Sequence, residues 1–514
     1  MENATAQPFT DRLISRTPWW AISIGLHAVL ALVMVYVVAL GSSADDEEAV
    51  VVHVAKKLRP LDEFDPPKDL PPTNKILDLK KTSEETVFRK TNEDRKVETR
   101  DEDFREMARG DDTSLVDKNP FKSRNPNSSI GLQGGGGGKF GTRIGGLNDR
   151  SRDGGGGPDT QGAVREALKW LARHQGSKGS WSVQGYSDRC GSVAKYTGRC
   201  IPNPGYGDYE VGVTGLALLA FLGAGYSHHS RDLWDGIRVG DVVRRGLEWL
   251  ISQQDTDGCV GSREVHRHLY NHLIAALALC EAYGLTGSLL TRDAAQKSLD
   301  FTIAAQNPDR GWRYVSRQGE NDTSVTGWGA MVLKSAEISG LSVPRTAYDG
   351  IRTWLDLVTS SDYYRVGYDR RDTGTVYDEH NKRFNGHEAL TAIGMMARIF
   401  MDRNRGDARL AGGAQLLLRD LPKWDGNDID FYYWYNGSLA MFQFDGPSGT
   451  GWLRWNGAMK EAVVHHQNVN AGCKTGSWEP IDRWSCEGGR VYSTALNCLT
   501  LEVYYRYANV FGAR

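Results

Sequence analysis

The stretch Ala167-Leu-Lys-Trp-Leu-Ala-Arg-His-Gln-Gly-Ser-Lys-Gly-Ser-Trp181 sets a pattern that recurs through the second two-thirds of the chain. It reads as a helix with periodic apolar residues that ends at Gln175, followed by a short loop carrying Gly179 and Trp181. The later copies contain Gln254, Gly258 and Val260, then Gln306, Gly311 and Trp312, and finally Gln467, Gly476 and Trp478. Self-similarity of this kind indicates stacked helical units that share one continuous core.

A second kind of helix, apolar and rich in small residues, follows each of these units. The six segments are 211–220, 271–280, 324–333, 386–395, 435–442 and 491–500. A helix that is apolar nearly all round is buried on every side, whereas an amphipathic helix lies at the periphery. Two of the six outer helices, near Ile351 and Gly413, lack the Gln/Trp signature. The sequence therefore predicts an all-α fold, an α/α toroid of six inner and six outer helices.

The Gln-x-x-x-Gly-x-Trp pattern on alternating helices resembles the repeats of squalene and hopene cyclases, which are shared with the β-subunits of protein prenyltransferases. The resemblance extends from about residue 162 to the C-terminus and implies the same toroid. We interpret the repeated Gln and Trp residues as structural. The Gln amide is expected to bond backbone groups at a helix end, while the Trp ring stacks over the loop.

The N-terminal region contains one long apolar run, residues 19–40, whose helical length matches a hydrocarbon core of about 30 Å. Arg12 and Arg16 precede it and the acidic run 45–48 follows it. The positive-inside tendency then predicts a cytoplasmic segment at 1–18, a single membrane span at 19–41 and an extracytoplasmic (periplasmic) remainder. A cleaved signal peptide is the alternative interpretation of the same run.

The predicted span holds one ionisable residue, His27, with Ser23 one helical turn earlier. Ser-x-x-x-His resembles the anchor of TonB-type energy transducers, and the Pro-containing segment 59–72 is similar to the region that follows the anchor in that family. The resemblance implies a proton-channel motor protein as partner. The alternative is a neutral histidine that bonds a backbone carbonyl within the membrane.

Residues 42–158 are rich in charged residues, Pro and Asn, and they contain two glycine tracts, 134–138 and 154–157. This composition predicts a disordered linker. The toroid domain is then expected to occupy residues 159–514.

All seven cysteines lie in the toroid region. In an extracytoplasmic compartment, the loop pairs Cys190/Cys200 and Cys473/Cys486 are expected to form disulfides. No Cys-x-x-Cys motif occurs, so neither a metal site nor a cofactor is predicted from the cysteines. The zinc set of the prenyltransferases also has no counterpart, because no Asp-x-Cys element lies near a matching inner helix.

Acidic, histidine and aromatic residues gather where inner helices are expected to begin. The candidate ligand-binding residues are Glu210, His272, His387, Glu388, Tyr433, Trp434, Tyr435 and Tyr492. Such a set at the mouth of an apolar funnel fits either a cation-handling cavity or a groove for a lipid, isoprenoid or peptide ligand. The aromatic residues could instead belong to the core.

The cyclases that the repeats resemble use an Asp-x-Asp-Asp acid. The nearest match here runs from Asp425 to Asp430 and has Asn at the position of the middle acid. Asp428 and Asp430 are therefore the candidate catalytic acids. The alternative is a loop in which these side chains cap the next helix.

Three functions follow from these patterns. The first is a membrane-anchored, non-catalytic or divergent toroid that binds an apolar or peptide ligand as a scaffold. The second is a divergent terpene cyclase that uses Asp428 or Asp430 as its acid. The third is a TonB-like partner of a proton-driven motor. The near balance of 62 basic and 64 acidic residues, with no basic stripe in the repeats, argues against a nucleic-acid partner.

Overall fold

The computed structural model describes residues 154–200, 205–371, 377–378, 383–384 and 387–507. These residues belong to the second of the two units into which the chain divides, Asp94–Arg514. The predicted membrane span at 19–41, with Ser23 and His27, lies outside the described residues, as does nearly all of the linker. Among the described residues, no helix has the length and apolarity needed to cross a membrane.

The described part of the chain is built almost entirely of helices. The inner helices are α5 (Glu210–Gly223), α7 (His268–Thr286), α9 (Thr323–Ser339), α11 (Ala389–Asp402), α13 (Phe431–Asp445) and α15 (Ser485–Leu501). The outer helices are α4 (Pro158–Arg173), α6 (Val239–Ser252), α8 (Leu289–Ala304), α10 (Arg345–Val358), α12 (Ala408–Arg419) and α14 (Thr450–Val464). The short elements are α16 (Val503–Arg506), the 3-10 turns η4 (Tyr186–Arg189), η5 (Gly207–Tyr209), η6 (Gly426–Asp428) and η7 (Gly472–Lys474), and the strands β1 (Leu233–Trp234), β2 (Ile237–Arg238), β3 (Tyr377–Asp378) and β4 (Arg383–Phe384). The strands pair antiparallel as β1–β2 and β3–β4.

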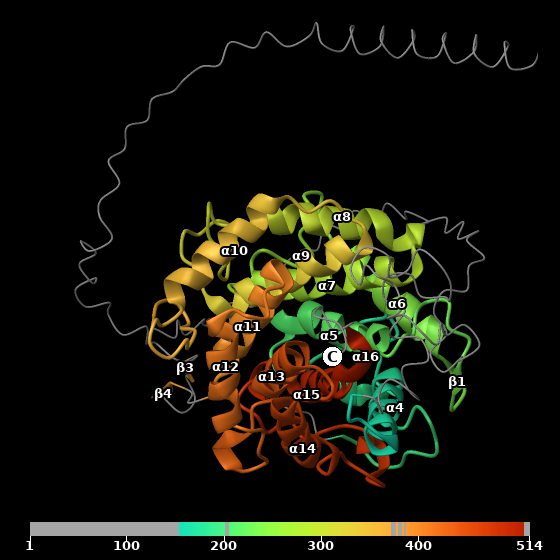
Figure 1. The fold of residues 1–514 in the computed structure, drawn as a ribbon. Coiled ribbons are helices and arrows are strands. Elements are labelled where there is room, and N and C mark those ends of the chain that lie inside the picture. The colour runs from blue at the N-terminus through green and yellow to red at the C-terminus, as the bar shows by residue number, and fades with distance from the viewer. Residues whose placement is uncertain (1–153, 201–204, 372–376, 379–382, 385–386, 508–514) are drawn as a thin grey trace, which may run out of the picture. The chain divides into compact units, whose positions relative to one another are not determined.

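The six inner helices of the described chain form a closed ring. Each packs against the next inner helix in the sequence, and α15 packs against α5 to complete the circle. The outer helices surround this ring, each in contact with at least one inner helix that adjoins it in the chain (Figure 1). The predicted α/α toroid is therefore confirmed.

The two layers differ in burial as their sequences predict. Every residue of α5 after Glu210 is buried, because this helix has neighbours on all sides. The outer helix α10 buries only the stripe that includes Ala347, Ile351 and Trp354 and exposes its polar face. Small residues allow the inner helices to approach closely: a Cβ on Gly215 would meet the backbone of α7.

The repeated glutamines tie each outer helix to the next. The Nε2 of Gln175 donates to the carbonyl of Gly179 in its own loop, at 2.9 Å, and to that of Val242 on α6, at 2.8 Å. Gln254 links its own loop to Ala294 on α8, and Gln306 links its loop to Ala347 on α10. The structural interpretation of the Gln residues is confirmed, since each amide donates to one carbonyl in its own loop and to one near the start of the next outer helix.

The last glutamine closes the ring. Gln467 donates to Gly476 in its own loop and to Ala163 on α4, at 2.9 and 2.8 Å, so the final outer helix is tied to the first. Gly476 has φ +94°, and a Cβ there would collide with the carbonyl of Glu166 on α4. The glycine thus provides both a left-handed backbone and a close approach.

The repeated tryptophans hydrogen-bond the loops to the ends of the outer helices. The indole Nε1 groups of Trp181, Trp312 and Trp478 each donate at 2.8 Å to a carbonyl in the last turn of the preceding outer helix. All three side chains are fully buried. These hydrogen bonds to helix ends confirm the predicted structural role of the tryptophans.

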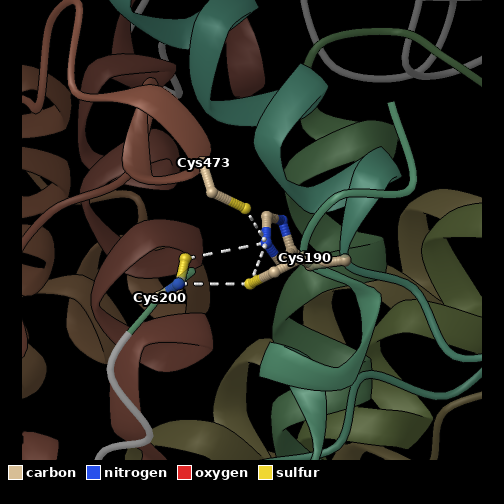
Figure 2. A group of neighbouring side chains, drawn as sticks. Cys190, Cys200 and Cys473 are labelled. Atoms are coloured by element: carbon tan, nitrogen blue, oxygen red, sulfur yellow. Dashed lines mark hydrogen bonds between the residues drawn. The ribbon is translucent and has the colours of Figure 1, made fainter. Parts of the chain in front are cut away.

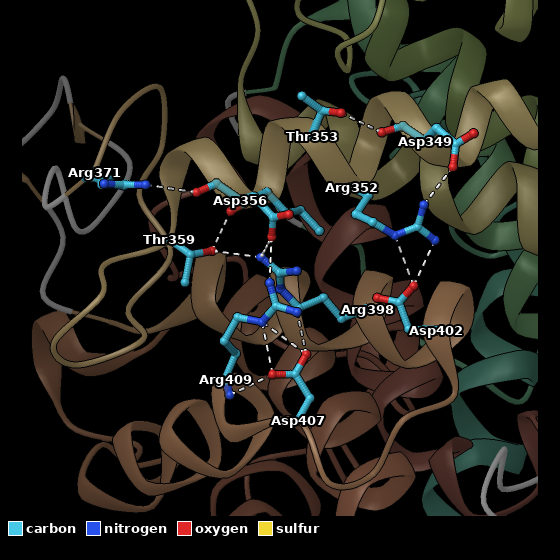
Figure 3. A network of polar contacts seen from close by, with 11 residues as sticks. Asp349, Arg352, Thr353, Asp356, Thr359, Arg371, Arg398, Asp402, Asp407 and Arg409 are labelled. Atoms are coloured by element: carbon cyan, nitrogen blue, oxygen red, sulfur yellow. Dashed lines mark hydrogen bonds and ion pairs between the residues drawn. The ribbon is translucent and has the colours of Figure 1, made fainter. Parts of the chain in front are cut away.

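Ion pairs join the outer helices that lack this signature (Figure 3). Asp356 on α10 accepts from Arg409 on α12, at 2.6 Å, and from Arg398 on α11, at 2.9 Å. Arg352 on α10 pairs with Asp402 at the end of α11, at 2.8 Å. Charged side chains here connect elements that glutamine amides connect elsewhere.

The C-terminal segment occupies the ring at the C-terminal ends of the inner helices. Fully buried Arg506 donates to the Leu219 carbonyl on α5, at 3.0 Å, and to both carboxylate oxygens of Glu281 on α7, at 3.1 Å. The Tyr507 hydroxyl also donates to Glu281, and the Tyr507 carbonyl accepts from Gln443 on α13. The Tyr507 ring lies edge-on against the ring of Phe400 on α11. The segment therefore acts as a plug that fills one end of the toroid with the chain's own side chains.

The second glycine tract belongs to the folded domain rather than to the predicted linker. Trp452 on α14 donates to the carbonyl of Gly154, at 2.8 Å, and Asn456 donates to that of Gly155, at 2.9 Å. These bonds fix the entry of the chain into α4 beside the last outer helix.

Candidate functional site

The starts of the inner helices share one end of the toroid with the Gln/Trp loops, because each loop leads from an outer helix into the next inner one. Helix dipoles and unpaired N–H groups favour acidic side chains at such ends. Asp322 and Asp430 cap α9 and α13 by accepting from the backbone N–H groups of Val325 and Tyr433, at 2.7 and 2.9 Å. The predicted capping role of the Asp425–Asp430 loop is thus observed.

The two candidate catalytic acids have different surroundings. The side chain of Asp428 is 55% exposed and lies 3.9 Å from Lys423. Asp430 is buried and, besides capping α13, forms an ion pair with Arg483, at 3.3 Å. Asp428 therefore lacks the buried setting that keeps a carboxyl group protonated at neutral pH.

A second buried carboxyl group, which the sequence analysis did not select, lies beside Asp430. Asp482 hydrogen-bonds with Ser485 and with Tyr492, one of the predicted ligand residues. Burial, together with the nearby charge of Asp430, raises the pKa of Asp482 to about 7. Burial likewise raises the pKa of Asp322 to about 7. Both carboxyl groups can hold a proton at neutral pH.

Some of the predicted ligand residues come together and others do not. His387 stacks on Tyr433, with 5.3 Å between ring centroids, and shares a hydrogen bond with Asp420, at 3.0 Å. Burial opposes the charged imidazole, but the bond to Asp420 raises its pKa above the usual value. Glu388, next in sequence, pairs with Arg365, at 2.5 Å.

His272 lies apart, between α7 and α8. Its Nδ1 accepts from the N–H of Val260, at 3.1 Å, and its Nε2 shares a hydrogen bond with Thr302, at 2.9 Å. Burial lowers its pKa to about 3, so the ring is neutral and holds the second Gln loop in place. These contacts give His272 a structural role.

The aromatic run on α13 faces the protein interior. Tyr433, Trp434 and Tyr435 are fully buried, and Tyr435 stacks against Trp328 on α9. Glu210 is half-buried at the start of α5. These three aromatic residues therefore belong to the core, which was the alternative interpretation of the run. Their placement gives no direct support to the predicted role in ligand binding.

A different set of aromatic residues, with two arginines, lies at the inner-helix starts; all are half-buried except Tyr206, which is exposed. We call it the aromatic face; it comprises Tyr206, Tyr209, Arg267, Tyr270, Arg313, Tyr314, Tyr432 and Trp484. Both arginines lie over the Tyr314 ring, at 5.2 and 5.1 Å from its centroid. The hydroxyls of Tyr270 and Tyr432 both bond the Ser324 Oγ, at 3.0 and 2.9 Å. The face thus connects the starts of α7, α9 and α13.

A cluster of thiols and one imidazole lies at the junction of the first and last repeats (Figure 2). His174 follows α4, Cys190 and Cys200 lie in the loop to α5, and Cys473 lies in the loop from α14 to α15. The His174 Nε2 is 3.3 Å from the Cys473 Sγ and 3.7 Å from each of the other two sulfurs. The four donor atoms all lie within 4.8 Å of one another.

The geometry contradicts the predicted disulfides, because all seven cysteines are free thiols in the structure. Cys473 lies beside His174, whereas exposed Cys486 donates to the Arg483 carbonyl, at 3.1 Å. Cys190 and Cys200 both approach the same imidazole rather than bonding each other. The local spacing suggested two pairs, but closure of the ring brings three of the four cysteines together.

The comparisons with known proteins concern the fold. No known sequence family and no curated protein matches the chain. Solved structures that are similar to it include a protein described as a novel alpha-amylase from Clostridium perfringens (11% identity, TM-score 0.42) and the type II terpene cyclase MstE from Scytonema (13% identity, TM-score 0.42). Both alignments cover 67% of this chain, and they cover 98% and 97% of the respective structures. These similarities assign no activity to the chain.

Proposed function

We propose that the chain is a membrane-anchored, extracytoplasmic toroid of cyclase/prenyltransferase-like architecture whose aromatic face binds a peptide segment of a partner protein. The aromatic face carries this proposal. Tyr, Trp and Arg dominate the energetic centres of protein interfaces, since they offer large contact areas and directional polar groups. Here they are held half-buried by mutual contacts, and Tyr206 remains 58% exposed.

The plug at the opposite end favours a surface binding site over an enclosed reaction chamber. Arg506 and Glu281 are fully buried, and they join the C-terminal segment to α5 and α7. Removing one member of such a pair leaves a buried charge without its partner, so the plug is costly to displace. Ligand access is therefore assigned to the inner-helix starts.

A peptide-display selection on the full-length chain in detergent tests the proposal. Selected peptides should bind at least 10-fold more weakly to Tyr314→Ala, because this substitution removes the ring under both arginines. Leu289→Ala is the control, since Leu289 is 66% exposed and follows an inner helix at the other end of the toroid. Equal losses in the two variants, or no selectable peptide, would contradict the assignment.

A divergent terpene cyclase is the second candidate function, and the buried Asp430–Asp482 pair favours it. A carboxyl group with a pKa of about 7 beside a second acid could donate a proton to an alkene. Incubation with squalene should then give a cyclised product that is lost in Asp482→Asn and Asp430→Asn. Asp428→Asn is the control, because Asp428 is exposed, and this variant should retain activity. If the wild-type chain gives no cyclised product, then squalene cyclisation is excluded as its function.

The anchor supplies a third, separate proposal. Ser23 and His27 would dock the predicted membrane helix on a proton-channel motor, while the toroid remains outside the cytoplasm. The basis is the Ser-x-x-x-His spacing within an apolar run. His27→Ala should abolish site-specific crosslinking to the motor subunits without preventing membrane insertion, and unchanged crosslinking would exclude the motor.

A further inference from the structure

We propose that His174, Cys190, Cys200 and Cys473 bind one Zn²⁺ ion that joins the first repeat of the toroid to the last. Three thiolates and one imidazole are a standard donor set for structural zinc, with bonds of about 2.3 Å to sulfur and about 2.0 Å to nitrogen. A tetrahedron of these bonds has sulfur–nitrogen edges of about 3.5 Å. The observed distances of 3.3, 3.7 and 3.7 Å bracket this value.

The imidazole is already oriented for coordination. The Nδ1–H of His174 donates to the Trp170 carbonyl, at 2.8 Å, which leaves the lone pair of Nε2 free to face the three sulfurs that lie within 3.7 Å of it. The ring also stacks on the Trp170 indole, with 4.1 Å between centroids. A backbone acceptor of this kind fixes the tautomer of metal-binding histidines.

The sulfur atoms are supported in the same way. The backbone N–H of Cys200 donates to the Cys190 Sγ, at 3.2 Å, as expected for a sulfur that carries negative charge. His174, Cys200 and Cys473 are buried and Cys190 is only partly exposed. With all four positions filled by protein atoms and little solvent access, the site is structural rather than catalytic.

Nearby cations offset the charge of the complex. Zn²⁺ with three thiolates carries a net charge of −1 once three thiol protons have been released. Arg173 interacts electrostatically with Cys473, and Arg490 interacts with Cys200. Arg173 also donates to the Thr475 carbonyl, at 2.8 Å, and stacks over Tyr196. The junction thus supplies two positive charges that interact with the cluster.

The ion would act as a clasp between distant parts of the sequence. His174 and Cys473 are separated by 299 positions, and each stands at the end of a repeat. A cross-link over so long a loop removes more entropy from the unfolded chain than one within a single loop. Zinc would therefore stabilise the ring where its two ends meet.

Metal analysis of the untagged full-length chain, purified in detergent without added chelator, tests the clasp. One zinc per chain is expected, and Cys473→Ser should lose at least 10-fold in zinc affinity. Cys486→Ser is the matched control, because Cys486 is exposed and outside the cluster; it should retain full zinc content. Zinc-free wild-type chain, or a Cys473→Ser variant with wild-type affinity, would overturn the proposal.

Cobalt substitution of the wild-type chain gives a second readout that does not depend on how a variant folds. Tetrahedral Co²⁺ with thiolate ligands should show intense visible bands and sulfur-to-cobalt charge transfer in the near ultraviolet. A Cys190–Cys200 disulfide is the competing state, and it would appear as a loss of two hydrogens in the intact mass. That mass loss without these cobalt bands would also overturn the proposal.

Discussion

The junction between α14 and α4 and the junction between α10 and α12 both join outer helices, but they use different chemistry. At the first, Gln467 bonds two buried carbonyls, Gly476 fits tightly against α4, and the thiol cluster lies beside them. At the second, Asp356 and Arg409 form an ion pair in which the aspartate side chain is 49% exposed.

From this contrast we expect burial to decide how much each junction contributes to the free energy of unfolding. A buried carbonyl without a donor costs about 1–3 kcal/mol, because water cannot replace the lost bond. An exposed ion pair contributes about 0–1 kcal/mol, since water and salt screen it. We therefore expect substitutions at the α14–α4 junction, where the ring closes, to lower the free energy of unfolding more than substitutions at the α10–α12 junction.

The largest effect is expected at the tight glycine of the closing junction. Gly476→Ala should lower the free energy of unfolding by more than about 4 kcal/mol, through left-handed backbone strain and collision with the Glu166 carbonyl. Gly426→Ala is the control, because Gly426 also has positive φ but no atom near its missing Cβ. Urea titration of both variants measures the difference, and similar losses would show that close approach is unimportant.

The effect of burial can also be tested on the buried carboxyl group of Asp322, through the pH dependence of the free energy of unfolding. The pKa of Asp322 is raised to about 7 in the fold, against about 3.9 in an unfolded chain. Between pH 4 and 7 the folded state binds the additional proton, so this group makes the protein less stable as pH rises through that window. Asp322→Asn removes the effect and should gain about 2–4 kcal/mol relative to wild type between pH 4 and 7.

Thermal unfolding across this pH range provides the measurement. Arg313, Tyr270, Tyr368 and Tyr432 all interact with Asp322 and remain in the variant. Asp428→Asn is the control, because that side chain is largely exposed, and its pH profile should follow wild type. Parallel profiles for all three proteins would refute the assignment of a buried, protonated carboxyl group.

A smaller loss is expected for the glutamine of the closing junction. Gln467→Ala removes the hydrogen bonds to the carbonyls of Ala163 and Gly476, each worth about 1 kcal/mol, and should cost about 2 kcal/mol with no dependence on salt. Gln296→Ala is the comparison, since Gln296 bonds only an exposed aspartate within its own helix. A strong salt dependence for Gln467→Ala would mean that charge, not buried hydrogen bonding, holds this junction.

The smallest effect belongs to the ion-paired junction. Arg409→Gln should cost less than about 1 kcal/mol in low salt, and the loss should shrink further in high salt. Chemical denaturation at two ionic strengths measures it. A loss equal to that of Gln467→Ala would remove the contrast between the two junctions.

Much of the fold can be predicted from the sequence because its determinants are local. The 3.6-residue periodicity of the outer helices and the nearly all-apolar inner helices identify the two layers segment by segment. The bonds made by Gln175 and Trp181 also follow from their positions at helix ends. The ion pairs of α10 and α12 do not, since exposed charges have no distinctive spacing.

The thiol cluster was missed because its members are not local. Cys190 and Cys200 are ten positions apart in a loop, and their partners belong to the first and last repeats. One signal was present: in a closed toroid, the loops after the first and last outer helices are neighbours, and both carry cysteines. The predicted disulfides pair each cysteine with one in its own loop, and so they do not use this consequence of the predicted ring.

The aromatic face was missed for a related reason. Its tyrosines precede or begin four different inner helices, and no single segment concentrates them. The aromatic residues at 432–435 are consecutive and so form a more obvious pattern, although three of the four are buried in the core.

Hydrogen–deuterium exchange of the full-length chain, with and without a zinc chelator, measures whether a bound metal ion joins the two ends of the ring. If it does, exchange after chelation should be faster at the end of α4, in the loop at 186–200 and in the loop at 472–478, and unchanged in α10 and α12. Identical exchange at the closing junction with and without chelator would contradict it.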